Sequence, residues 1–212
     1  MYVRNRMTKD PYVISWNASI SDAVALMKEK SLKRVPVVEG EKVVGILTLG
    51  DINKVSPTAA TSLSVFEINY LLNKLIVKDA MSKKLISIEA EELLESAAVL
   101  MREEGISTLP VVENDKLVGI ITESDIFDAF IDMLGFRDKG SRVTVEAENI
   151  PGSMAEIANI YKSLGINISR IAVFEENGVT GVIIRSDATE TTEIEKELNE
   201  KGYKVTHVLI QE

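Results

Sequence analysis

The 212-residue chain contains no cysteine and only one histidine, His207. Without cysteine it can form no disulfide, no thiolate nucleophile and no thiolate metal site. With a single histidine, a histidine-rich metal site or a serine–histidine relay has almost nothing to draw on. We therefore expect no metal site, and we expect His207 to lie at a surface or a strand edge.

Long apolar runs are missing as well. The first residues, MYVRNRMTKDP, contain no apolar core of signal-peptide length. No segment approaches a run of about 20 apolar residues, which a membrane-spanning helix needs. We expect a cytoplasmic protein with no membrane partner.

Positively charged residues are fewer than negatively charged ones. The chain has 24 Lys and Arg residues and 33 Asp and Glu residues, which gives a net charge of −9. A broad nucleic-acid surface needs clustered cations that displace counterions. We therefore expect no nucleic-acid partner. A small anionic ligand held by a few local cations is still compatible with this charge.

Motifs of catalysis are also lacking. The chain has no glycine-rich phosphate loop of the type G-x-x-x-x-G-K-[ST]. The adjacent carboxylates Glu103-Glu104 and Glu175-Glu176 lie on expected surfaces, where such pairs are usually solvated charge. We expect no catalytic residues and no enzymatic activity.

What the sequence does contain is a duplication with an offset of 74 residues. The stretch VVGILTLGDI (43–52) returns as LVGIITESDI (117–126), and Pro36-Val37-Val38-Glu39 returns as Pro110-Val111-Val112-Glu113. The two copies align from Met7 to Ile52 without a gap. Such self-similarity indicates a repeated structural unit.

Each copy reads as strand, helix, strand, strand and short helix. The segment SISDAVALMKEK opens with a Ser-x-x-Asp capping signal at Ser19 and Asp22 and keeps its apolar residues at helical spacing. Two β-branched runs then flank a turn at Gly40 or, in the second copy, at Asn114-Asp115. A short helix follows Thr48 or Thr122, and Pro57 is expected to end the first of these.

Between the copies, a capping signal from Ser64 to Glu67 precedes a long apolar segment. It predicts a connecting helix that packs on the pair. The expected buried stripe is Val65, Ile68, Leu72 and Ile76.

After Phe136 the segment RDKGS indicates a domain boundary. The rest reads strand, helix, strand, strand, helix, strand, with Asn177-Gly178 as the hairpin turn between the middle strands. We expect an antiparallel sheet with both helices on one face.

These motifs carry two family resemblances. Each copy has a [VL]-P-V-V run and closes on G-I-[LI]-T-x-x-D-I, which resembles the CBS domain, a module that works in tandem pairs. Residues 140–212 resemble the ACT domain through Ile150-Pro151-Gly152 and Gly165-Ile166-Asn167-Ile168, although the acidic residue common before that Pro-Gly is replaced by Asn149-Ile150. The order CBS-CBS-ACT resembles regulatory proteins associated with acetoin utilisation.

The resemblance implies an α+β architecture with three parts. Residues 1–60 would form CBS repeat 1, and residues 61–135 the connecting helix and CBS repeat 2, the two β-α-β-β-α units packing as a pseudo-twofold pair. Residues 140–212 would form a βαββαβ, ferredoxin-like ACT domain.

The CBS resemblance also implies a regulatory ligand, namely an adenine nucleotide (AMP, ADP or ATP) or S-adenosylmethionine, bound in clefts between the copies. Asp51 and Asp125 match the ribose-binding position, and a carboxylate can accept two charge-assisted hydrogen bonds there. Thr48 and Thr122 would contact the ribose or first phosphate. Arg34 would reach a phosphate, whereas the second copy has Thr108, so we expect inequivalent clefts. The expected site residues are Thr8, Arg34, Pro36, Thr48, Asp51, Ser82, Thr108, Pro110, Thr122 and Asp125.

A structural alternative exists for each of these motifs. Thr48-x-x-Asp51 and Thr122-x-x-Asp125 both satisfy a capping box, and duplicated helices need duplicated caps. Gly45 and Gly119 interrupt strands, where glycine allows close backbone approach for either core packing or ligand clearance.

In the ACT-like part, the resemblance implies an amino-acid site and a dimer. The expected site residues are Asn149, Gly152, Ser153, Met154, Asn167 and Ile168. Pro151-Gly152 also suits a simple helix start.

Three functions compete. The leading one is a non-catalytic, ligand-sensing homodimer that changes its domain arrangement and acts on an unidentified regulated protein. The alternatives are a structural or partner-binding module without a ligand and, against the missing motifs, an enzyme.

Overall fold

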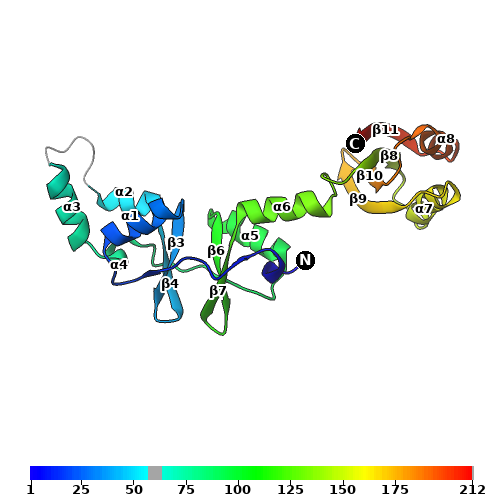
Figure 1. Cartoon of the computed structure of the whole chain (residues 1–212). Coiled ribbons are helices and arrows are strands. Elements are labelled where there is room, and N and C mark those ends of the chain that lie inside the picture. The colour runs from blue at the N-terminus through cyan, green and yellow to red at the C-terminus, as the bar shows by residue number, and fades with distance from the viewer. Residues whose placement is uncertain (57–63, 212) are drawn as a thin grey trace. The chain divides into compact units, whose positions relative to one another are not determined.

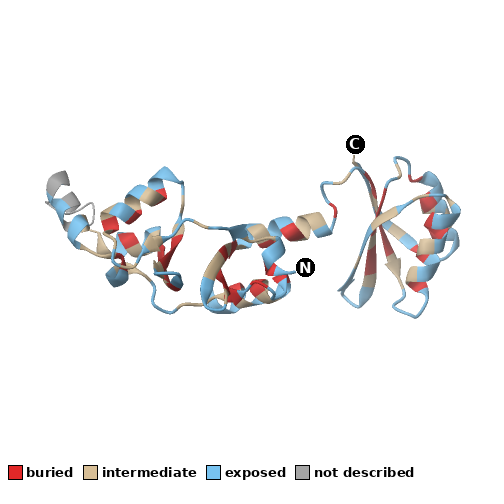
Figure 2. Cartoon of the chain, turned by 60° about the horizontal axis from the view of Figure 1, so that its bottom comes forward, coloured by how far each residue is buried: buried red, intermediate tan, exposed pale blue. Residues whose placement is uncertain are grey.

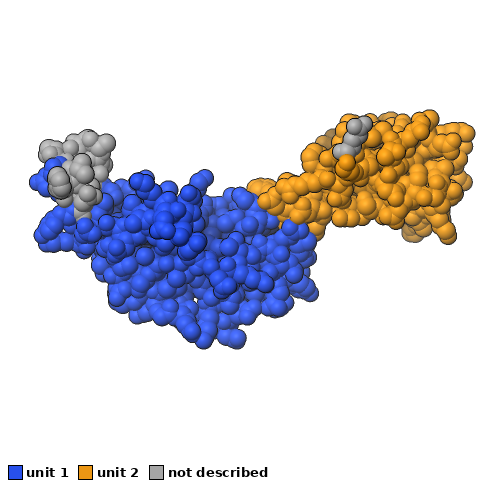
Figure 3. Space-filling view, viewed as in Figure 1, with its two compact units in different colours: residues 1–126 blue, residues 127–212 orange. Residues whose placement is uncertain are grey.

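The computed structural model describes residues 1–56 and 64–211 (Figure 1). The described chain divides into two compact units, Met1–Ile126 and Phe127–Glu212 (Figure 3). None of the helices in these described ranges is both long and apolar enough to cross a membrane. The predicted helix end at Pro57 lies outside the described residues.

The first unit contains two copies of one element order, joined by two helices. The first copy comprises η1 (Val3–Asn5), β1 (Thr8–Lys9), β2 (Ile14–Ser15), α1 (Ile20–Glu29), β3 (Arg34–Glu39), β4 (Lys42–Thr48) and α2 (Leu49–Val55). The connection comprises α3 (Val65–Lys74) and α4 (Val77–Ala80). The second copy comprises β5 (Ile88–Glu89), α5 (Leu94–Glu104), β6 (Thr108–Glu113), β7 (Lys116–Thr122) and α6 (Glu123–Met133), whose last residues belong to the second unit.

The two copies contribute matching halves of one sheet, whose order is β2-β3-β4-β7-β6-β5. In each half a short parallel strand precedes an antiparallel hairpin, and the register shift between Val37 and Val38 recurs between Val111 and Val112. The halves join where Lys42 of β4 faces Lys116 of β7. The duplicated sequence therefore builds a duplicated half-sheet, bulge included.

The helices follow the predicted apolar spacing. Helix α1 begins at its predicted cap, where the Asp22 amide donates to Ser19 Oγ over 3.0 Å. It buries Ile20, Ala23 and Met27 against Val35 and Leu47. Burial of each such larger side chain contributes about 1.5–3 kcal/mol to stability. Helix α5 buries the equivalent Leu94, Ala97 and Met101.

The connecting helix α3 begins after the predicted cap, where the Glu67 amide donates to Ser64 Oγ over 3.3 Å and the Ser64 amide donates to Glu67 Oε2 over 2.7 Å. Leu72 of the predicted stripe packs against the core of the first copy. The side chains of Val65 and Ile68 lie outside the described part of the chain.

The first segment of each copy, around Met7 in the first and around Met81 in the second, packs on the sheet of the other copy. Strand β1 pairs with β7, placing Thr8 opposite Ile120, and the Ser82 amide donates to the Ile46 carbonyl of β4 over 3.0 Å. Gly45 and Gly119 make this exchange sterically feasible. A Cβ at Gly45 would lie 2.6 Å from the Ser82 carbonyl oxygen, and one at Gly119 would lie 2.5 Å from Met7 Sδ.

We expect Gly45→Ala to destabilise the first unit by about 1–3 kcal/mol, because a backbone carbonyl must move to admit the methyl group. Gly119→Ala should cost less, since its closest contact is the flexible Met7 side chain and the nearest backbone atom, the Thr8 carbonyl oxygen, lies farther away at 3.0 Å. Urea unfolding of both variants tests this order. Gly50→Ala is the control, because its methyl would meet only an ordinary contact at 3.5 Å within helix α2. Equal losses for Gly45→Ala and Gly50→Ala would contradict the close-approach explanation.

The second unit contains β8 (Gly140–Ala147), α7 (Ser153–Ser163), β9 (Ile168–Glu176), β10 (Val179–Ser186), α8 (Thr192–Glu200) and β11 (Lys204–Gln211). The antiparallel sheet has the order β11-β8-β10-β9. Asn177 and Gly178 adopt positive φ angles of 52° and 78°, so the predicted hairpin turn is confirmed.

The core of the second unit lies between this sheet and its two helices (Figure 2). Ile157 of α7 and Ile194 of α8 pack there with Val143 of β8 and Val182 of β10. The helices therefore cover one face of the sheet.

Candidate functional site

Two clefts in the first unit are related by the repeat. Cleft I has a volume of about 640 Å³ and contains Thr8, Ile120 and Thr122. Cleft II has a volume of about 690 Å³ and contains the equivalent residues Ser82, Ile46 and Thr48. Both volumes fall in the range of about 300–1,000 Å³ that is usual for small-molecule sites.

Each cleft is built from both copies. Thr8 of the first copy faces cleft I together with Thr122 of the second, and Ser82 of the second faces cleft II together with Thr48 of the first. This follows from the exchange of the segments around Met7 and Met81 described above. A ligand in either cleft would contact both copies, so it could favour one arrangement of the pair over another.

The Thr48 and Asp51 side chains form a complete capping box at the start of α2. Thr48 Oγ1 donates to Asp51 Oδ2 over 2.6 Å, and the Asp51 amide donates back to Thr48 Oγ1 over 3.1 Å. Lys54 Nζ donates to the second carboxylate oxygen, Asp51 Oδ1, over 3.2 Å. Asp51 is therefore a helix cap and a cleft residue at once.

The electrostatic surroundings of Asp51 keep it ionised. Partial burial alone would raise the pKa of the Asp51 carboxyl, but hydrogen bonds from Thr48 and Lys54 together lower this pKa below its usual value. The carboxylate is thus a charged acceptor at the wall of cleft II.

The second copy repeats the capping bonds of the first, but only one of its two capping residues lines a cleft. Thr122 Oγ1 and the Thr122 amide each donate to Asp125 Oδ2 over 2.7 Å. Thr122 lines cleft I, whereas Asp125 lines neither cleft. The two ribose-binding candidates are therefore inequivalent.

Arg34 lies at the centre of the pair and lines both clefts. Its Nη1 donates to Ser107 Oγ and, over 2.6 Å, to Thr108 Oγ1. Thr108 is the repeat equivalent of Arg34 itself, so equivalent positions of the two copies meet here. A second arginine at position 108 would bring two guanidinium groups into contact, and their like charges would repel each other.

The Arg34 guanidinium has no carboxylate partner among the described residues. Its two hydroxyl partners orient it without neutralising it. Arginine binds phosphate through several N–H donors in a fixed fork. Arg34 is thus a cation available for an anionic ligand in either cleft.

Of the remaining predicted residues, Pro36 lines cleft I and Pro110 lines neither cleft. Tyr12 and Glu123 of cleft I, and Lys54 and Lys84 of cleft II, were not predicted. Only Lys54 had a usable signal, since its i+3 spacing from Asp51 brings the two side chains together on a helix.

In the second unit the predicted amino-acid site is split. Asn167 and Ile168 line a shallow cavity of about 450 Å³ together with Tyr161. The other four predicted residues lie apart from it. Gly152 and the buried Ser153 begin α7, Met154 packs against the core, and Asn149 Nδ2 donates to Glu175 Oε1 over 3.3 Å.

The Tyr161 hydroxyl has no hydrogen-bond partner in the described part of the chain, and burial raises its pKa. Across all the described residues of both units, no group of three or more His, Cys, Asp or Glu is placed to hold a metal ion. The second unit therefore offers a weaker candidate site than the two clefts.

A family model described as "CBS domain" matches residues 3–57 and 77–132. The chain is 30% identical over 149 residues to the CBS domain-containing protein YhcV of Bacillus subtilis, covering 70% of this chain and 97% of that protein.

Other relatives are larger proteins. The chain is 28% identical over 172 residues to an inosine-5'-monophosphate dehydrogenase of Korarchaeum cryptofilum, covering 81% of this chain but 33% of the relative. A homoserine O-acetyltransferase of Methanococcus vannielii is 35% identical over 126 residues, which are 58% of this chain and 24% of the relative. The chain thus spans about a third or less of these two enzymes.

Among solved structures, a Vibrio cholerae protein named for acetoin utilization (AcuB) is 27% identical, with a TM-score of 0.54 over 65% of this chain and 96% of that one. CBSX2 in complex with AMP is 27% identical, with a TM-score of 0.51 over 62% and 96%. The CBS domain pair of MJ0100, in complex with 5'-methylthioadenosine and S-adenosyl-L-methionine, is 27% identical, with a TM-score of 0.50 over 61% and 99%.

The matched segments are the two copies of the repeat, and the two clefts lie between them. The chain therefore belongs to the CBS domain family, with a tandem pair of these domains.

Proposed function

We propose that the chain is a non-catalytic ligand sensor whose CBS pair binds an adenine nucleotide or an adenosyl compound between its two copies. The observation that carries this proposal is cleft II. One cavity there is lined by the ionised Asp51 and by Arg34, whose guanidinium pairs with no carboxylate among the described residues. A carboxylate suits the two ribose hydroxyls and a guanidinium suits a phosphate. The similar structures solved in complex with AMP, or with 5'-methylthioadenosine and S-adenosyl-L-methionine, support this ligand class.

The test is calorimetric titration of the full chain with AMP, ADP, ATP and S-adenosylmethionine, with melting temperatures recorded in parallel. A ligand at 100 times its Kd stabilises the folded state by about 2.7 kcal/mol, which raises Tm by several degrees. UMP is the control, since it keeps the ribose and phosphate but lacks the purine. If no adenine compound raises Tm at millimolar concentration, the proposal fails.

That failure would favour the second candidate, a structural or partner-binding pair without a ligand. Its supporting observation is that both capping boxes are complete by themselves, so Thr48, Asp51, Thr122 and Asp125 each have a structural role. An enzymatic activity has no comparable support.

We assign CBS repeat 1 to residues 1–60, and the connecting helix with CBS repeat 2 to residues 61–135. Residues 140–212 are assigned to an ACT domain that dimerises and is the candidate for amino-acid binding. Support comes from the element order of the second unit and from its edge strand β9, which exposes Ile171 and Val173. Light scattering on the titration samples tests the dimer, because a monomeric mass at all concentrations would exclude it.

A further inference from the structure

We propose that the two clefts take different classes of adenosyl ligand, with cleft II selecting a phosphate-bearing nucleotide and cleft I an adenosyl compound without phosphate. This inference rests on the proposed function and assigns each cleft its own ligand chemistry. Its basis is the set of positions at which the two copies differ in charge.

At the first such position the two copies carry side chains of opposite charge. Lys84 lines cleft II, and its repeat equivalent Asp10 lines cleft I. Lys84 also pairs with Glu104, which lies outside the cleft lining. Asp10 has no ion pair among the described residues. A phosphate would therefore meet a cation in cleft II and a free carboxylate in cleft I.

The second position adds a negative charge to cleft I alone. Leu49 begins α2 beside cleft II, and its equivalent Glu123 begins α6 beside cleft I. The backbone is the same at both, because the Leu49 amide donates to the Lys33 carbonyl over 3.1 Å and the Glu123 amide to the Ser107 carbonyl over 3.2 Å. The helix starts thus match, and only the side chain differs.

The charged linings differ accordingly. Cleft II has four cations and one carboxylate, Lys33, Arg34, Lys54, Lys84 and Asp51. Cleft I has three cations and two carboxylates, Lys9, Lys33, Arg34, Asp10 and Glu123. Carboxylates that line a cleft repel a phosphate, whereas cations that line it raise the local concentration of the phosphate. Cleft II is therefore the better site for a polyanion.

Cleft I has a further feature that suits a ligand with positive charge. Tyr12 lines it, where the second copy has Ile86, and the Lys30 ammonium already lies 5.2 Å from the centre of its ring. An aromatic face that attracts an ammonium group also attracts a sulfonium. Together, Tyr12, Asp10 and Glu123 favour a cationic adenosyl compound such as S-adenosylmethionine.

The wild-type experiment is calorimetry with ADP and S-adenosylmethionine, singly and in succession. We expect each to bind with a stoichiometry near one per chain, and S-adenosylmethionine to bind with little change after saturation with ADP. If the two ligands compete for one site, or ADP fills both clefts equally well, the inference is wrong while adenosyl binding itself stands. If neither ligand binds, the proposed function fails as well.

Exchanging the residues between the copies tests the cause. Asp10→Lys with Glu123→Leu charges cleft I like cleft II at these two positions, and we expect it to weaken S-adenosylmethionine binding about tenfold and to create a second ADP site. Lys84→Asp with Leu49→Glu should weaken ADP binding by a similar factor. Melting temperatures verify that both variants fold, and unchanged affinities in folded variants would overturn the assignment.

Discussion

Asp51→Asn should weaken ADP binding in cleft II by about ten- to a hundredfold, which corresponds to the roughly 1.5–3 kcal/mol typical of a hydrogen bond to a charged group. The substitution is nearly isosteric. Its remaining oxygen can still accept the Thr48 hydroxyl and amide, so the cap at α2 is kept. The oxygen lost is the one that faces Lys54, which is the acceptor available to a ligand. Calorimetric titration of the variant measures the loss.

A matched control comes from the same motif in another helix. Asp22 caps α1 with the same geometry, since Ser19 Oγ donates to Asp22 Oδ2 over 2.7 Å, but Asp22 lines neither cleft. Asp22→Asn should therefore change the stability of the fold about as much as Asp51→Asn does, and it should leave ADP affinity unchanged. If both variants bind ADP as the wild type does, Asp51 is a helix cap and nothing more.

The pH dependence of stability gives an independent readout of the Asp51 cap. The folded-state pKa of Asp51 is lower than its ordinary value, so its ionised form stabilises the fold above the unfolded pKa. This contribution is lost as pH falls through the folded pKa. The stability difference between wild type and Asp51→Asn, measured by urea unfolding, should therefore shrink as the pH falls below about 4.

Local patterns made the repeated elements predictable. Ser19 and Asp22, Thr48 and Asp51, and the strands around Gly45 each depend on neighbours within a few residues, and these predictions are confirmed. The alternatives that the sequence left open at Gly45 and Gly119 are resolved towards close packing of the exchanged segments.

The composition of the clefts was less predictable, because it depends on contacts between copies. Strand β1 has only two exposed residues, Thr8 and Lys9, so no periodicity reveals its pairing with β7. The contact of Arg34 with Thr108 arises only when the two copies face each other. Asp125 matches the motif as well as Asp51 does, and yet it does not line a cleft.

Arg185 shows the same limit in the second unit. In sequence it is a charged residue near the end of a strand, VTGVIIRS, which usually indicates a solvated position. In the fold it is buried on β10, between Arg142 of β8 and Arg170 of β9 in the strand register. Burial lowers the pKa of its guanidinium, the Asp138 carboxylate raises it and Arg142 lowers it further.

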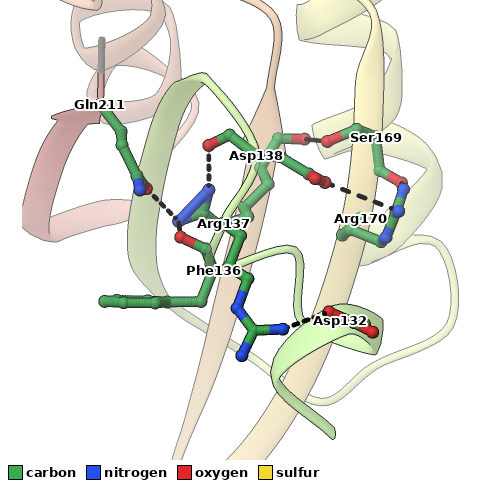
Figure 4. A network of polar contacts seen from close by, with 8 residues as sticks. Asp132, Phe136, Arg137, Asp138, Ser169, Arg170 and Gln211 are labelled. Atoms are coloured by element: carbon green, nitrogen blue, oxygen red, sulfur yellow. Dashed lines mark hydrogen bonds and ion pairs between the residues drawn. The ribbon is translucent and has the colours of Figure 1, made fainter. Parts of the chain in front are cut away.

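The partners of Arg185 explain why a charged group is retained there. Its guanidinium donates to the Asp138 carbonyl over 3.1 Å, the Phe136 carbonyl over 3.5 Å and Gln211 Oε1 over 3.1 Å, and it lies 6.0 Å from the Phe136 ring (Figure 4). The Arg185 side chain thus connects β10 both to the segment that precedes β8 and to the end of β11. An apolar residue can donate to none of these acceptors, and a lysine ammonium lacks the planar fork of donors that a guanidinium presents.

We therefore expect Arg185→Met to destabilise the second unit by about 2–4 kcal/mol, because the acceptors lose a charged donor while the apolar volume is kept. The stability of Arg185→Lys should fall between that of Arg185→Met and that of the wild type, since a lysine ammonium keeps the charge but lacks the planar, forked donors of a guanidinium. Limited trypsin digestion gives a local readout, because Arg137 and Lys139 flank Asp138. Cleavage at these two sites should accelerate in Arg185→Met.

Arg170→Met is the control for this prediction. Arg170 is exposed and pairs with the Asp138 carboxylate at 3.5 Å (Figure 4), and such surface pairs contribute about 0–1 kcal/mol. Its loss should leave both Tm and cleavage nearly unchanged. If Arg185→Met melts like Arg170→Met and the sites at Arg137 and Lys139 stay protected, the segment before β8 is held by its backbone and apolar contacts, and the buried charge contributes no net stability.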